Sequence, residues 1–398
     1  MTDPDLALLA ADLQAGRLDE ASARKVAAKV PAEGAAGRQA SALATEAMDA
    51  YAAGRTRDAW AAATIADAAT KAWSERPSQI FRGGGNDKVL DLRVRALVVQ
   101  SFIEADAGRE GTSSEFRRAS EEVLRRMRDS SRTGLAVAVA KSERALRLGR
   151  AEEAVAVMEE ALRNPRLDDS QRAAAQAVLA GALRVAGREA EGIATLEATA
   201  ESFARAGRPS AVIDADLERG IHLLQAGDKV AARALLSQVA DAAAKSGHDK
   251  AEFEARLRLG VLGAEAQEHL ESAQQFQLAA AAARRVKDDA RVVIALRNAA
   301  DELRLDHDLA GAERLLDEAL AIGGTPGLEV DNAKAKVVFA VLRNQQGRQD
   351  DAYRLLLEAE ETFQRKLDEL EHGESPRLRE DLESQRRQVL TLRETLSR

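Results

Sequence analysis

Small and large apolar residues recur along the chain at a nearly fixed interval. From Ala154 onward, a small residue follows a short polar turn at steps of 38 to 41 residues. Its later copies are Gly192, Ala232, Ala273, Ala312 and Ala352. In most copies a large apolar residue stands four positions further on, at Met158, Leu196, Leu236, Leu316 and Leu356. A four-residue step places both residues on one face of a helix, so the pattern predicts a helix after each turn.

The turns carry the signals that end one helix and begin the next. Four clear copies start with Gly-Arg and finish with Ala, at residues 16–21, 54–59, 149–154 and 347–352. Glycine accepts the left-handed backbone that closes a helix, and acidic residues favour the positive end of the helix that follows. Each copy therefore predicts a helix-turn-helix junction.

A second set of small residues, spaced by 40, marks the other helix of each pair. Its members are Ala180, Gly220, Gly260, Ala300 and Ala340. Small residues let two helices approach closely. Two helices in every 40 residues predict an all-α fold, a right-handed α-solenoid of about nine helix-turn-helix repeats with a C-terminal capping helix.

One interval is longer than the others. From Ala59 to Ser113, which follows the turn Gly108-Arg109, the chain takes 54 residues, about 14 more than one period. The excess falls in a stretch rich in turn residues. We therefore expect four segments, which are N-terminal hairpins over 1–75, a Gly-rich inserted loop over 76–88, the repeat array over 89–372 and a capping or coiled-coil helix over 373–398.

With these spacings the chain resembles the tetratricopeptide-repeat (TPR) family, in a lengthened form of about 40 residues like that of kinesin light chains and some bacterial peptide-sensing regulators. The Trp and Tyr that usually pack such helices are replaced here by Leu and Ala. The resemblance implies that the first helix of each pair lines a concave groove, and that the groove holds a partner.

The positions that such repeats commonly use for ligands form an apolar set followed by a more polar set. The apolar set is Leu217, Ile221, Leu224, Leu257 and Val261. The second set is Arg297, Asp301, Arg304, Lys334, Val337, Val341 and Asn344. Together they would suit an amphipathic helix or an extended peptide with acidic groups. The alternative is that packing between repeats fills the apolar positions.

The inserted loop offers a second surface. Ile80, Phe81 and Arg82 form an exposed apolar segment that could dock a partner. The glycines 83–85, between Arg82 and Lys88, could form a backbone nest for an anion, but the sequence lacks the Gly-Lys-Ser/Thr ending of a nucleotide-binding loop. We expect a flexible connector at these glycines.

The last segment carries a heptad stripe. It consists of Leu378, Leu382, Val389, Leu392 and Leu396. Covering the exposed face of the last repeat is the interpretation that we prefer, and a homodimer through this helix is the alternative.

Composition narrows the function. The net charge of -8, with basic residues scattered among acidic ones, argues against a nucleic-acid partner. Cysteine is absent, and the five histidines lack metal-type spacing; His307, between two aspartates, is the most ligand-like, but a solvated turn fits it better. No catalytic constellation can be assembled. We expect no catalytic residues, no metal and no cofactor, and therefore no enzyme.

Targeting signals are also missing. The first residues are acidic, and nowhere do eighteen apolar residues run together, so we expect a cytoplasmic protein without membrane insertion. Richness in alanine and arginine hints at a bacterial source. The sequence predicts a non-catalytic scaffold or adaptor that binds a protein or peptide segment. The alternative is a sensor of a peptide or small ligand that regulates an effector protein.

Overall fold

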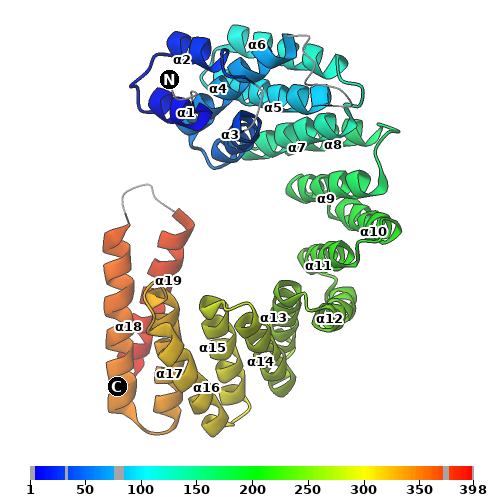
Figure 1. Cartoon of the computed structure of the whole chain (residues 1–398). Helices are drawn as coiled ribbons and strands as arrows, with labels where there is room; N and C mark the ends of the chain where they lie inside the picture. Colours follow the sequence, from blue (N-terminus) through cyan, green and yellow to red (C-terminus); the bar gives the residue numbers. More distant parts are fainter. Residues whose placement is uncertain (1–4, 32–34, 76–84, 371–375, 397–398) are drawn as a thin grey trace. The chain divides into compact units, whose positions relative to one another are not determined.

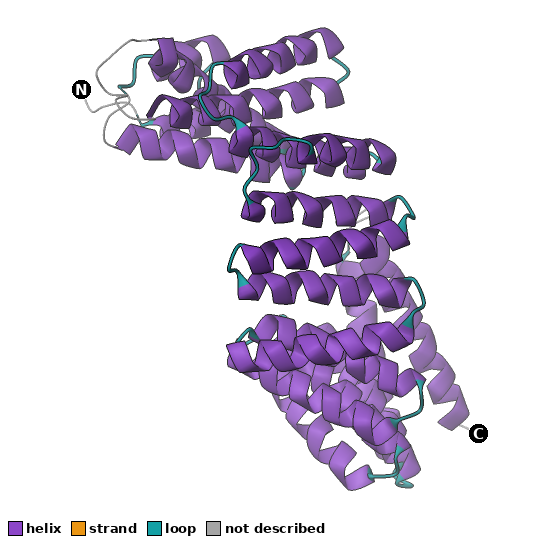
Figure 2. Ribbon diagram, turned by 90° about the vertical axis from the view of Figure 1, so that its right-hand side faces the viewer, coloured by secondary structure: helices purple, strands orange, loops and turns teal. Residues whose placement is uncertain are grey.

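The computed structural model describes residues 5–31, 35–75, 85–370 and 376–396, and the ordered elements of these ranges are all helices (Figure 2). The chain divides into two compact units, residues 1–206 (unit 1) and residues 207–398 (unit 2). None of the described helices is both long enough and apolar enough to cross a membrane.

Unit 1 contains ten of the described helices, coloured blue to green in Figure 1. They are α1 (Leu6–Gln14), α2 (Glu20–Ala27), α3 (Ala35–Ala52), α4 (Thr56–Glu75), α5 (Gly85–Asp106), α6 (Glu110–Arg125), α7 (Ser131–Arg147), α8 (Ala151–Leu162), α9 (Asp169–Val185) and α10 (Glu189–Arg205). Helix α5 starts inside the predicted loop, so residues 85–88 are helical instead. The Asp87 carboxylate accepts a hydrogen bond from the Arg128 N–H at 3.2 Å, which ties the start of α5 to the segment after α6.

Unit 2 contains the other nine described helices. They are α11 (Pro209–Gln225), α12 (Lys229–Ser246), α13 (Asp249–Glu265), α14 (His269–Arg285), α15 (Asp289–Leu305), α16 (Leu309–Gly323), α17 (Glu329–Gln345), α18 (Gln349–Glu369) and α19 (Pro376–Leu396). Over the described ranges the helices thus form nine consecutive pairs followed by one last helix. The predicted α-solenoid of helical hairpins is confirmed. We name the first helix of each pair the A helix and the second the B helix.

Left-handed residues close most of the turns within pairs, as the Gly-Arg signals predicted. Gly16, Gly54, Gly108, Gly149 and Gly347 all have φ between 71° and 77°. Three glycine-free turns place Gln267, Lys287 and His307 in the same region, with φ of 60°, 58° and 64°. His307 is therefore part of an exposed turn between α15 and α16, where it takes the backbone conformation that glycine takes elsewhere.

The small residues spaced by 40 lie where A and B helices of one pair cross closely. A Cβ atom added to Gly260 would lie 2.6 Å from Cε1 of Phe276, and one added to Gly220 would lie 2.7 Å from Cδ2 of Leu236. Real Cβ atoms do not approach other carbons this closely, because the overlap is strongly repulsive. At these positions glycine sets the distance between the helices of unit 2.

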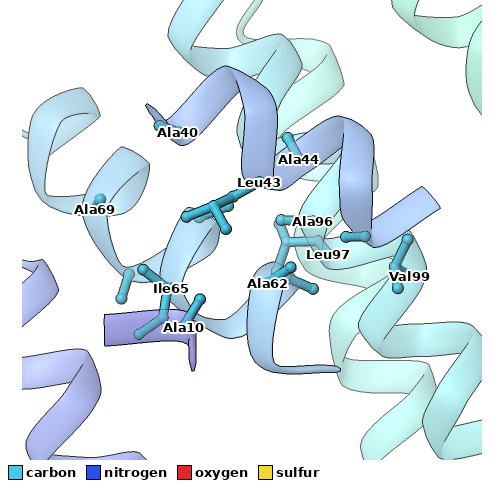
Figure 3. Close-up of a cluster of buried hydrophobic side chains, with 14 of the residues drawn as sticks. Ala10, Ala40, Leu43, Ala44, Ala62, Ile65, Ala69, Ala96, Leu97 and Val99 are labelled. Atoms are coloured by element: carbon cyan, nitrogen blue, oxygen red, sulfur yellow. The ribbon is translucent and has the colours of Figure 1, made fainter. Parts of the chain in front are cut away.

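Unit 1 has a core of alanines with a few larger side chains among them. Figure 3 shows Leu43, Ile65 and Leu97 in one cluster, with alanines of α1, α3, α4 and α5 around them. Ile65 is completely buried, and Leu43 and Leu97 are 3% exposed. Since alanine adds little bulk, the helices pack at short distances and the few large side chains fill the space between them.

A polar network joins three A helices of unit 1. The Tyr51 hydroxyl on α3 donates to Asp106 Oδ2 on α5 at 2.5 Å, and Arg144 on α7 donates to Asp106 Oδ1 at 2.5 Å and to the Tyr51 oxygen at 3.1 Å. The Tyr51 and Phe102 rings lie 5.4 Å apart, centroid to centroid. Burial, together with the hydrogen bond to Asp106, raises the pKa of Tyr51 to about 12.

We expect the Tyr51 phenol to lose its proton late in an alkaline titration. Its pKa is raised from 10.0 in the folded protein, so the stabilisation from the neutral phenol is complete below pH 10 and is lost as the pH rises through about 12. The chain has two tyrosines, Tyr51 and Tyr353, and ultraviolet absorbance of tyrosinate reports both. The step near pH 12 should disappear in Tyr51→Phe. A late step that survives in this variant would contradict the assignment.

Helix α19 packs against the last hairpin and completes its core. Leu382 and Val389 are 1% and 0% exposed and join a cluster that includes Phe363 of α18. Leu392 and Leu396 pack against the same cluster, whereas Leu378 is 41% exposed. Most side chains of the heptad stripe thus pack against the last hairpin of the same chain, so α19 caps the last repeat. A homodimer through this stripe would require these side chains to leave the core.

Candidate binding surfaces

The predicted groove positions lie on the A helices of unit 2. In Figure 1 these helices, α11, α13, α15 and α17, follow one another through the unit. Side chains of neighbouring A helices contact one another: Arg291 Nη2 of α15 forms an ion pair with Glu254 Oε1 of α13 at 3.6 Å, and His248 Nε2, just before α13, lies 3.4 Å from Asp214 Oδ1 of α11. We name the surface formed by the predicted positions on these helices the A face.

The apolar positions of the A face differ in burial. Leu217 and Val337 are 7% and 5% exposed and belong to core clusters, so they pack the unit and do not face a ligand. Ile221, Leu224 and Leu257 are partly buried and pack against core clusters of unit 2. Val261 is 44% exposed. Packing between repeats therefore uses part of the predicted apolar strip and leaves Val261 as its most open member.

The C-terminal end of the A face is covered by α19. The Lys334 ammonium donates to Asp381 of α19 at 2.7 Å. Val341 and Asn344 line a cavity of about 60 Å³ together with Leu392 and Leu396 of α19. These three predicted groove residues face the chain's own last helix, so the open part of the A face lies on α11, α13 and α15.

Arg297 is a half-buried cation without an ion-pair partner among the described residues. Its guanidinium donates to Asn298 Oδ1 on the same helix, at 3.0 Å from Nη2 and 3.3 Å from Nε. Burial lowers the pKa of Arg297, while the charges of Asp331, Asp301 and Asp381 raise it. A guanidinium stays charged in proteins and carries five N–H donors, so most of the donors of Arg297 are available to an anion.

Two further predicted residues, Asp301 and Arg304, form an ion pair with each other. Arg304 Nη2 lies 2.7 Å from Asp301 Oδ1, one turn away on α15, and the Arg304 side chain is 11% exposed. The same part of the unit contains Asp331, whose pKa is raised by burial and lowered by the nearby Arg297 and Lys334. Of the predicted basic residues of the A face, Arg297 alone lacks a carboxylate within 4.0 Å in the described part of the chain.

A different concave surface lies in unit 1, between α5, α6, α7 and α8. Two cavities of about 540 Å³ and about 550 Å³ share Lys141, Glu153 and Val157 among their lining residues and so form one continuous groove. One half is mainly apolar and the other mainly polar. We name it the α6–α8 groove. None of its lining residues belongs to the sites predicted from the sequence.

The cause of this groove is visible in the repeat register. Where five B helices, α8, α10, α12, α16 and α18, have a small residue followed by a large apolar residue, α6 has Ser113, Arg117 and, three positions further on, Ser120, and all three line the polar half. Ser113 turns toward α5 and donates from Oγ to the Ser101 carbonyl at 2.9 Å. Helix α6 accordingly packs on α5 and has at most marginal contact with α7. Arg117, in the place of a leucine, was the signal that could have revealed the groove.

The predicted loop surface of Ile80, Phe81 and Arg82 lies outside the described residues and stays a prediction. The described ranges contain no group of three or more His, Asp or Glu side chains that could hold a metal ion.

Comparison with known proteins identifies the fold class. No protein-family profile matches the chain, and no curated protein sequence does. The crystal structure of the apo form of RapI is similar with a TM-score of 0.55 and 10% identity, over 88% of this chain and 97% of that one. A tetratricopeptide repeat protein from Parabacteroides merdae has a TM-score of 0.40 and 14% identity, over 75% and 98% of the two chains. The TPR-like repeats of a putative kinesin light chain from Podosopora anserina have 0.40 and 20%, over 49% and 97%.

The consecutive helix pairs of the described residues give the protein a TPR-like α-solenoid fold, as its sequence predicted, and the RapI structure shares this fold over most of both chains.

Proposed function

We propose that the protein is a non-catalytic scaffold or adaptor that binds a segment of a partner protein on the open part of its A face. The observation that supports this most is Arg297, a half-buried cation with no described carboxylate within 4.0 Å, although the more distant charges of Asp301, Asp331 and Asp381 act on it. Burying a charge without a direct partner is costly, and a bound carboxylate that accepts hydrogen bonds from the guanidinium would lower that cost. The expected partner segment therefore carries an acidic side chain or a C-terminal carboxylate.

The neighbouring helix supplies an apolar contact. Val261 of α13 and Asp301 of α15 occupy the same register position one period apart, and Arg297 lies one turn before Asp301. Val261 is 44% exposed and Leu257, one turn before it, is partly buried. An apolar side chain of the partner would cover Val261 while its carboxylate pairs with Arg297. A cytoplasmic location stays a prediction of the sequence.

Substituting Arg297 tests this proposal. A partner can be captured on the full chain from the native cell, identified by mass spectrometry and titrated by calorimetry. Arg297→Met should weaken binding by about tenfold or more, because a charge-assisted hydrogen bond contributes about 1.5–3 kcal/mol. Arg297→Lys keeps the charge but loses the planar fork of donors, so it should bind with intermediate affinity.

Arg314, an exposed arginine on the B helix α16, provides the matched control. Arg314→Met should bind like the unchanged protein, and circular dichroism should show that all variants remain helical. Equal affinity of Arg297→Met and Arg314→Met would refute the site.

A further inference from the structure

We propose that the α6–α8 groove of unit 1 is a second docking site, which binds an acidic amphipathic helix of a partner protein. The site is separate from the A face and comes from a gap in the packing of the hairpins.

The gap interrupts a regular packing scheme. Within the units, the B helix of one pair packs on the A helix of the next pair at α4–α5, α8–α9, α12–α13, α14–α15 and α16–α17. At α6–α7 this contact is essentially missing, and Figure 1 shows α6 and α7 apart, with α5 between them. One flank of α7 therefore lacks the neighbouring B helix that α5, α9, α13, α15 and α17 have; of the other A helices of unit 1, α3 likewise has at most marginal contact with the B helix before it.

The flank that lines the groove runs along the whole of α7, with Ser131 and Ala138 buried, Leu135, Lys141 and Arg144 partly exposed, and Leu148 45% exposed. The groove is lined by a stripe of α7 residues at steps of three and four, namely Ser131, Leu135, Ala138, Lys141, Arg144 and Leu148, the last just past the helix end. Helices pack against each other along such stripes. The helix has 17 residues, which corresponds to about 25 Å. A partner helix of four to five turns would match this length, whereas a small molecule would occupy only part of it.

The apolar half provides the main contact area. Leu124 of α6, Leu135 of α7 and Val157 of α8 face a cavity of about 540 Å³. This volume lies within the range of about 300–1,000 Å³ typical of ligand sites. Large apolar side chains on one face of a helix would fill it, as in other helix-in-groove complexes.

The polar half contains cations that could pair with acidic side chains of a partner. Lys141 has no ion-pair or hydrogen-bond partner among the described residues, and Arg117 donates only to Ser114 Oγ, at 3.0 Å. Two of the carboxylates in the groove are already compensated. Asp106 lies 2.5 Å from Arg144, and Glu153 lies 3.5 Å from Arg150.

Glu110 is the remaining acid in this half, beside the two available cations Arg117 and Lys141. The side chains that line the polar half therefore carry a surplus of positive charge, although the whole chain has a net charge of -8. Charge complementarity therefore favours carboxylates on the flank of the bound helix.

A displayed library of helical peptides, selected on the full-length chain, tests this proposal. Bound peptides are eluted by competition with the soluble protein. Those that the unchanged protein elutes but the Lys141→Glu variant does not should share apolar residues at steps of three and four and at least one Asp or Glu beside them. A synthetic peptide of this kind should bind Lys141→Glu and Leu135→Asp at least about tenfold more weakly than the unchanged chain. Replacing its acid by lysine should restore binding to Lys141→Glu, because the charges are then exchanged.

Two controls separate this site from the A face. Lys245 is an exposed lysine on α12, and Lys245→Glu should leave the peptide affinity unchanged. Arg297→Met should also leave the peptide affinity unchanged. A failure of the α6–α8 groove as a site can therefore be told apart from a failure of the proposed A-face function. The proposal is overturned if no peptide family is enriched, if the enriched peptides need no acidic residue, or if their affinity depends on Arg297 and not on Lys141. Circular dichroism of Lys141→Glu and Leu135→Asp ensures that the comparison is between folded proteins.

Discussion

Replacing Phe363 by alanine is expected to lower the free energy of unfolding of unit 2 by about 3–5 kcal/mol. The Phe363 ring is completely buried in the cluster that joins α17, α18 and α19, beside Leu382 and Val389. Its removal takes away apolar contacts and leaves a cavity that three helices cannot close without moving. Denaturant unfolding followed by circular dichroism measures the loss.

Phe363→Leu is the matched control for this substitution. Leucine keeps most of the apolar volume, so the loss should be clearly smaller than for alanine. Since α19 contributes to the same cluster, Phe363→Ala should also speed hydrogen exchange in α19. A cost below about 1 kcal/mol for Phe363→Ala would mean that α19 does not share this core.

The second large effect concerns Gly260. In an exposed helix, glycine to alanine stabilises by about 1 kcal/mol, because alanine has the better helix propensity. Here the new Cβ would lie 2.6–2.8 Å from three carbons of the Phe276 ring, so we expect Gly260→Ala to cost about 1–3 kcal/mol instead. Gly181 in α9 has no atom within 4 Å of an added Cβ, and Gly181→Ala should be neutral or stabilising.

A double substitution shows whether the clash is the cause. In a Phe276→Leu background the side chain facing Gly260 is smaller and more adaptable, so Gly260→Ala should cost less than in the unchanged protein. The difference between the two costs is the interaction energy of the pair. If Gly260→Ala raised the free energy of unfolding of unit 2, α13 and α14 would not approach each other as closely as the structure places them.

The elements of this fold could be predicted because their signals are local. A glycine followed by an acidic residue ends one helix and starts the next, and the small residue at Gly260 marks a close crossing. These signals depend on backbone conformation and on side-chain size at single positions. The repeat then places them in order along the chain.

The site could be predicted only in part, because burial and pairing depend on residues far away in the sequence. Leu217 and Val261 are both apolar residues of A helices, yet one lies in the core and the other is 44% exposed. Lys334 donates a hydrogen bond to Asp381, which lies 47 residues further along the chain. The heptad stripe predicted that α19 packs on the last hairpin, but no local pattern shows which groove residues it covers. The α6–α8 groove does have a local signal, Arg117, but its meaning depends on knowing that this position packs against the next hairpin.

Site-specific photo-cross-linking in the native cell tests the central claim, binding of a partner segment on the A face, most directly. A photoreactive amino acid at position 261 on α13 lies within the proposed contact, and the same amino acid at position 314 on α16 lies on a B helix outside it. We predict that the partner captured by the full chain becomes covalently attached through position 261 and not through position 314. Attachment through position 314 alone, or none at position 261 while the partner is still captured, would contradict the account.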